Sequence, residues 1–129
     1  MADVPELRVA LTVQDFDRAV AFYRDALGLP QLADWSSEGG RVVLLAAGRA
    51  TLELLDERQA ATVDEVEAGR RASGVVRLAL EVADSEEKAR RLVDAGAEPV
   101  AAPVRTPWGD RNVRVRAPDG MQLTLFTPP

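Results

Sequence analysis

The sequence predicts an α+β protein in which two βαβββ modules form curved mixed sheets around a cup. Three features lead to this prediction: an alternating segment that occurs twice, an amphipathic helical pattern after each copy, and short β-like segments after each helix. A repeat of this size cannot bury a sheet face alone, so the two copies must pack together. With 129 residues the chain is long enough for one hydrophobic core. We therefore expect a single domain, with modules at about residues 7–56 and 76–127.

The repeat is clearest in the two segments that open the modules. Residues 7–15 read LRVALTVQD and residues 76–84 read VRLALEVAD. The alternation of side-chain types predicts a half-buried strand in each copy. Asp15 and Asp84 follow where a helix N-cap is expected.

Each aspartate is followed by apolar residues at helical spacing, and the pattern stops at Gly28 in one copy and Gly96 in the other. Glycine at this place predicts a helix C-terminus. Three short strands are then expected in each module, because turn residues separate short apolar runs. Their ranges are residues 32–35, 41–46 and 50–55, then 98–101, 112–116 and 121–126.

A linker helix is expected between the modules at about residues 62–71. Glu65 and Glu67 stand early in this segment, and Arg70 and Arg71 stand late. Acidic residues near the N-terminus and basic residues near the C-terminus of a helix both interact favourably with its dipole.

Composition excludes several classes of function. The chain has no cysteine and no histidine, so neither a zinc or copper site nor a nucleophile activated by histidine is expected. Oxygen ligands alone are still compatible with magnesium, calcium or manganese. A net charge of −5 argues against a nucleic-acid partner. No apolar stretch is long enough to span a membrane, and residues 1–5 lack the features of a secretory signal, so we expect a cytoplasmic protein.

Strand parity separates the side chains that pack on the helices from those on the opposite sheet face. The opposite face is polar, which suits either simple exposure to water or a concave ligand site. Trp35 and Trp108 stand in or beside loops at similar places in the two copies, where an indole can stack on a flat ligand. The ligand-binding candidates are Arg8, Thr12, Trp35, Glu53, Arg77, Glu81, Trp108, Arg114, Thr124 and Phe126.

The charges on this polar face predict a cup that is positive by two. The residues counted are Arg8, Arg77, Arg114 and Arg116 against Glu53 and Glu81. Such a field favours a carboxylate or phenolate held by an arginine fork.

Two parts of the sequence resemble the motifs of a known family. Residues 21–29 read AFYRDALGL, and near the end of the chain residues 106–111 read TPWGDR and residues 117–123 read APDGMQL. These resemble the opening and closing motifs of the glyoxalase / bleomycin-resistance / dioxygenase (vicinal oxygen chelate) superfamily. The resemblance extends over about residues 7–126, and it implies the βαβββ fold and a homodimer.

The same resemblance implies where a metal would be held. Metal-dependent members carry ligands on the first, fourth, fifth and eighth strands, and the matching positions here are Arg8, Glu53, Arg77 and Thr124. Of these, Glu53 alone is a plausible ligand, because arginine stays protonated and has no lone pair to donate. We therefore expect no metal and no other cofactor, which argues against glyoxalase and dioxygenase chemistry.

Two roles are open for Arg8 and Arg77. They either form a salt-bridged cluster with Glu53 in place of the metal, or they bind an anionic or polar ligand. Glu53 is a weak candidate for a general base, since neighbouring arginines are expected to lower its pKa.

The leading hypothesis is a metal-free member of the superfamily that binds a small organic molecule, as proteins that sequester antibiotics or natural products do. An altered-site enzyme with lyase, isomerase or dioxygenase-like activity is the second hypothesis. A small-molecule sensor, or a scaffold without a ligand, is the third.

Overall fold

The computed structural model describes residues 3–129. Met1 and Ala2, which belong to the segment expected to lack a secretory signal, lie outside the described residues. The described chain forms one nine-stranded mixed sheet. The elements are β1 (Leu7–Val13), α1 (Phe16–Val20), η1 (Ala21–Ala26), β2 (Gln31–Asp34), β3 (Val42–Ala47), β4 (Ala50–Asp56), α2 (Glu57–Ala68), β5 (Val76–Glu81), α3 (Ser85–Asp94), β6 (Glu98–Pro99), β7 (Val104–Arg105), β8 (Arg111–Arg116) and β9 (Gln122–Thr127).

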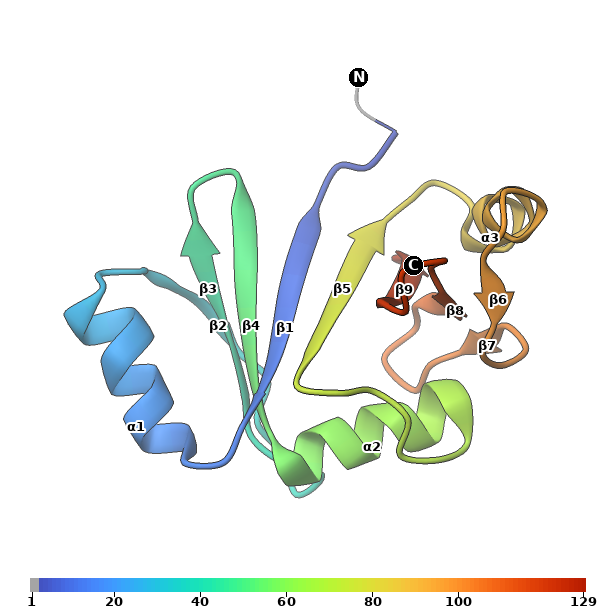
Figure 1. Ribbon diagram of the computed structural model, residues 1–129. Coiled ribbons are helices and arrows are strands. Elements are labelled where there is room, and N and C mark those ends of the chain that lie inside the picture. Colours follow the sequence, from blue (N-terminus) through green and yellow to red (C-terminus); the bar gives the residue numbers. More distant parts are fainter. Residues whose placement is uncertain (1–2) are drawn as a thin grey trace.

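The strand order is β2-β3-β4-β1-β5-β9-β8-β6, with β7 beside β8. Figure 1 shows α1 and α3 outside the two halves of the sheet, whereas α2 runs from the end of β4 towards β8. The α+β class and the two-module architecture predicted from the sequence are confirmed. No helix of the described residues has the length and apolar character needed to cross a membrane.

The two modules are joined by antiparallel pairing of β1 with β5 inside one chain. Within each module the first strand pairs in parallel with the last, β1 with β4 and β5 with β9. The register sets Arg8 opposite Ala79 and Ala10 opposite Arg77. Because alternate residues share a sheet face, this register puts the two arginines diagonally adjacent on one face.

The predicted helix starts are confirmed by their caps. The Asp15 side chain accepts a hydrogen bond from the Arg18 amide, and the Asp84 side chain accepts one from the Glu87 amide, each at 3.1 Å. The first helix differs from expectation in its second half, because α1 passes into the π-helix η1, in which the Leu27 amide donates to the Phe22 carbonyl. This wider turn is a rare local variant that residue spacing does not signal.

The linker helix is longer and lies earlier than predicted. It begins directly at the end of β4, where the Asp56 side chain accepts a hydrogen bond from the Gln59 amide at 2.7 Å. It ends at Gly69, which adopts a φ of 74°. Arg71 lies beyond this end and pairs with Glu57 instead of serving the helix dipole. The charge pattern therefore located the helix but misplaced both of its ends.

The strand predicted at residues 98–101 is also shorter than expected, because it spans only Glu98–Pro99. Pro99 and Pro103 lack the amide donors that would extend a ladder.

The apolar core lies in separate clusters on the two sides of the sheet. Each module packs its own helix on the outer face, with Phe16 and Val20 buried in the first module and Ala89 in the second. A smaller cluster on the inner face joins Ala10 to Val63 of α2. Helix α2 therefore covers part of the face that strand parity had predicted to be an open cup.

A buried ion cluster anchors α2 to the second module. Arg114 of β8 is fully buried and donates to Asp64 at 2.7 Å and to Glu67 at 2.6 Å. Burial alone would raise the pKa of Asp64, but hydrogen bonds from the amides of Ser73 and Ala72 and from Arg114 outweigh it and hold this pKa well below its usual range. Asp64 therefore stays ionised against two arginines, Arg114 and Arg71, of which Arg71 donates to it at 2.8 Å.

Replacing Arg114 with methionine should destabilise the fold strongly. The variant leaves the buried Glu67 without its cation and leaves Asp64 with Arg71 alone. Removing one partner of a buried ion pair typically costs about 3–5 kcal/mol of unfolding free energy. Urea denaturation followed by circular dichroism measures it. Arg116→Met is the matched control on the same strand, because Arg116 pairs with an exposed Glu98 at 3.4 Å, and such surface pairs contribute about 1 kcal/mol or less. Equal losses in the two variants would contradict the anchoring role.

Candidate functional site

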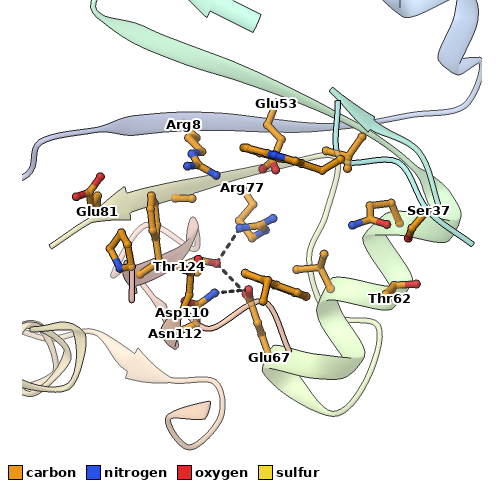
Figure 2. Close-up of a pocket in the computed structure, with 18 residues that line it drawn as sticks. Arg8, Ser37, Glu53, Thr62, Glu67, Arg77, Glu81, Asp110, Asn112 and Thr124 are labelled. Atoms are coloured by element: carbon orange, nitrogen blue, oxygen red, sulfur yellow. Dashed lines mark hydrogen bonds between the residues drawn. The ribbon is translucent and has the colours of Figure 1, made fainter. Parts of the chain in front are cut away.

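A cavity of about 480 Å³ is bounded by the inner sheet face and by α2 (Figure 2). Both halves of the sheet contribute to its wall, so the site depends on the pairing of the two modules. Of the predicted ligand-binding residues, those that line it are Arg8, Trp35, Glu53, Arg77, Glu81, Trp108, Thr124 and Phe126.

Two of the predicted ligand-binding residues lie elsewhere. Thr12 is near the end of β1, where its amide donates to the Val75 carbonyl, and it is not part of the cavity wall. Arg114 lies on the predicted face of the sheet, but α2 covers it. Its guanidinium forms ion pairs with Asp64 and Glu67.

Other cavity residues were missed by the sequence reasoning. Helix α2 contributes Gln59, Thr62 and Glu67. Gln59 lies before the predicted start of the helix, and no sequence pattern placed this helix over the inner face of the sheet. Asp110 comes from the turn before β8, where strand parity gives no information. Asn112 lies on the polar parity of β8, so a signal for it was present.

Arg8 is paired inside the protein and does not form a salt bridge with Glu53. Its Nε and Nη2 donate to Glu6 at 2.8 and 3.1 Å. The guanidinium carbon lies 5.2 Å from the ring centre of Trp35 and 4.7 Å from that of Phe126. The proposed cluster around Glu53 is therefore wrong for Arg8, because Glu6, two residues earlier on the same side of the chain, is the nearer partner.

Arg77 is held differently, although it occupies the equivalent position in the second module. It is 7% exposed, and its Nη1 donates to the Thr124 hydroxyl at 2.8 Å. That hydroxyl donates in turn to Glu67 at 3.2 Å, and Glu67 also accepts from Asn112 at 2.7 Å (Figure 2). Within residues 3–129, no carboxylate forms an ion pair with Arg77, so the remainder of its guanidinium is available to a ligand.

Glu53 is a cavity carboxylate without a hydrogen-bond or ion-pair partner among the described residues. Burial raises the pKa of Glu53, and the charges of Arg77 and Arg8 oppose this effect without overcoming it. The expectation that these arginines lower its pKa is therefore wrong. Burial also raises the pKa of Asp110, and a side-chain hydrogen bond from Trp108 opposes the rise only in part.

The four positions that carry metal ligands in the family do converge on the cavity, but their chemistry does not fit a metal ion. Two of them are guanidinium groups, which have no lone pair for a cation. The Thr124 hydroxyl is already engaged between Arg77 and Glu67. Within residues 3–129 there is also no group of three or more acidic side chains placed to hold a metal ion. Glu53 is thus the sole conventional ligand among the four.

The sequence matches the family model described as the Glyoxalase/Bleomycin resistance protein/Dioxygenase superfamily over residues 7–125. The chain belongs to this superfamily, as the resemblance of its motifs predicted. No curated protein matches the chain.

Solved structures of the same fold include methylmalonyl-CoA epimerase from Mycobacterium tuberculosis, with a TM-score of 0.70 and 25% identity over 100% of this chain and 91% of that chain. A variant of the Streptomyces coelicolor methylmalonyl-CoA epimerase in complex with 2-nitronate-propionyl-CoA has a TM-score of 0.65 and 24% identity, covering 99% of this chain and 98% of that one. A superfamily member from Vibrio splendidus 12B01 has a TM-score of 0.64 and 14% identity, and the match covers 95% of this chain and 97% of that chain.

Replacing Glu53 with glutamine should stabilise the protein increasingly as pH rises. A carboxyl group whose pKa is raised by folding destabilises the fold once pH exceeds its unfolded value, and the full cost is reached above its folded value. The difference in melting temperature between the variant and the original chain should therefore grow in favour of the variant from about pH 4 to about pH 8. Thermal unfolding at each pH measures it, with the exposed Glu38→Gln as control. A difference in melting temperature that does not change with pH would contradict the conclusion that the Glu53 carboxyl is buried.

Proposed function

We propose that this chain is a metal-free member of its superfamily that binds a small organic molecule in the cavity, and that its role is to sequester an antibiotic or natural product. The observation that carries the proposal is the presence of Arg8, Arg77 and Thr124 at three of the family's four ligand positions, with only Glu53 retained, around a cavity that remains open. Its volume of about 480 Å³ lies within the range of about 300–1,000 Å³ typical of small-molecule sites.

The aromatic wall supports a ligand with a flat or apolar part. Trp35 and Trp108 both line the cavity and are each 47% exposed. Trp35 already packs its ring against the Arg8 guanidinium, whereas Trp108 interacts with Asp110 through a side-chain hydrogen bond, which leaves its ring face for a ligand. An indole in this position contributes a large contact area to a bound ring.

Saturable binding without turnover is the expected result for a library of aromatic natural products and antibiotics. Binding should quench or shift the tryptophan fluorescence, and Trp108→Leu should remove most of that change while the melting temperature stays close to that of the original chain. Failure of every library compound to bind would contradict the proposal and favour a scaffold.

A reconstructed ligand set provides the control for the metal-free site. The triple variant Arg8→His, Arg77→His and Thr124→Glu restores, with Glu53, the His/Glu/His/Glu set of metal-dependent members. After incubation with nickel, zinc, iron, manganese and magnesium and then desalting, elemental mass spectrometry should find about one ion per chain in the variant and none in the original protein. Stoichiometric metal in the original protein would overturn the proposal.

An enzyme is the second candidate, and the raised pKa of Glu53 favours it. A poorly solvated carboxylate in a cavity is a suitable general base, and methylmalonyl-CoA epimerases are among the structures of similar fold. Incubation with acyl-CoA thioesters in D₂O tests this candidate, because removal and return of a proton next to the carbonyl would introduce deuterium there. Exchange that is lost in Glu53→Gln would replace the binding proposal by an enzymatic one.

A homodimer, as the resemblance implies, and a cytoplasmic location belong to the same proposal. Exposed apolar side chains on and beside η1 and on β2 support self-association: Phe22, Leu27 and Leu32. A small-molecule sensor would use the same cavity and would differ in its partner, not in its ligand site.

A further inference from the structure

Two of the charged groups in the cavity wall are neutralised inside the protein. Arg8 is paired with Glu6 at 2.8 Å. Glu67 is paired with Arg114 at 2.6 Å, and both of these side chains are buried. Arg8 has its own counter-ion, and Glu67 shares Arg114 with Asp64, which Arg71 also neutralises. Neither Arg8 nor Glu67 therefore offers a full charge to a ligand.

The cavity charges that lack an ion-pair partner within residues 3–129 are mostly acidic. They are Arg77 on one side and Glu53, Glu81 and Asp110 on the other. The cup was predicted to be positive, and this prediction is wrong. Arg114 lies behind α2, Arg116 pairs with Glu98 on the surface, and Arg8 is neutralised locally.

Arg77 has hydrogen-bonding capacity that the described residues leave unused. It is more than nine-tenths buried, and its Nη1 alone donates to a protein side chain, the Thr124 hydroxyl. Glu53 acts on Arg77 through its charge, but no ion pair or hydrogen bond joins the two side chains within residues 3–129. Figure 2 shows this side chain pointing into the cavity between Glu53 and Thr124. A ligand oxyanion at this place would supply the missing acceptor, with the guanidinium already oriented by Thr124.

The carboxylates require the opposite chemistry. Glu53 enters the cavity from β4 and Asp110 enters from the turn before β8, so they approach a ligand from different walls. A ligand that carried only negative charge would meet three carboxylates and one arginine. A ligand that carried only positive charge would leave Arg77 uncompensated.

We propose that the ligand is a small amphoteric molecule, with a carboxylate or comparable oxyanion on Arg77 and an amino or amidino group directed at Glu53 and Asp110. This inference rests on the proposed binding function and narrows its ligand class from anionic or aromatic compounds to compounds that carry both charges.

A panel of single-ring probes with matched size tests the inference. The probes are benzoate, benzylamine, benzamide and the meta and para isomers of (aminomethyl)benzoate, titrated by calorimetry against the full chain. At least one zwitterionic isomer should bind about tenfold more tightly than benzoate and benzylamine, since each charge-assisted contact contributes on the order of one tenfold step.

Substitutions separate the two halves of the proposed site. Arg77→Met should weaken the zwitterion and benzoate about tenfold and leave benzylamine unchanged or tighter. Glu53→Gln with Asp110→Asn should weaken the zwitterion and benzylamine and leave benzoate unchanged or tighter. Arg116→Met is the control outside the cavity and should alter none of the affinities. The variant without the two carboxylates and the variant without Arg77 are expected to change the selectivity between benzoate and benzylamine in opposite directions. A general loss of folding would weaken every probe and could not produce both results.

Each result bears on one of the two proposals. Benzoate binding as tightly as the zwitterions, or equal affinity for all probes, would overturn the amphoteric ligand while leaving small-molecule binding intact. If no probe binds but compounds of the natural-product library do, the charges of those compounds decide: amphoteric compounds support the inference, and purely anionic or neutral compounds overturn it. If neither set binds, the proposed binding function itself is wrong.

Discussion

The ion cluster of Arg114 with Asp64 and Glu67 is the interaction on which the cavity depends. It fixes α2 against β8, and α2 is the element that turns an open sheet face into an enclosed site. The same Glu67 orients the Thr124 hydroxyl, which in turn positions Arg77. A structural anchor and a ligand-facing guanidinium are therefore linked through one carboxylate. The buried charges therefore bear on the geometry of the cavity as well as on the stability of the fold.

The family's ligand positions show how a fold can keep a site while changing its chemistry. Their side chains still project into one cavity, because strand parity and register are properties of the backbone. The electrostatic character has changed, since two cationic side chains now stand where lone pairs would be needed. A single carboxylate remains, and it is poorly solvated. The architecture is thus shared with the epimerases of similar fold, whereas the donor set is this chain's own.

Much of the fold was predictable because it depends on local patterns. The alternation in β1 and β5 and the caps Asp15 and Asp84 are read from neighbouring residues. The ends of α2 were not predictable in this way, since its cap, Asp56, is also the last residue of a strand. The expected strand ended at residue 55, and the charges of residues 65–71 placed the expected helix too late in the chain, so Asp56 was not considered as a cap.

The site was predictable in position but not in electrostatics. Parity placed Arg8, Glu53, Arg77 and Thr124 on one face correctly. It did not reveal that Arg8 turns to Glu6, that α2 covers Arg114, or that burial of Glu53 outweighs the charges beside it. These outcomes depend on distances and solvent exposure that arise only when distant segments pack together.

The antiparallel junction of β1 and β5 has a consequence for the way in which a guest sits in the cavity. Two related modules meeting edge to edge form a nearly two-fold symmetric enclosure, and a symmetric enclosure accepts an asymmetric molecule in two opposite poses. Here the equivalent arginines have taken different partners, Glu6 for one and Thr124 for the other. The duplicated halves therefore present two different ends of the cavity, and a ligand of the proposed kind would have a single preferred direction.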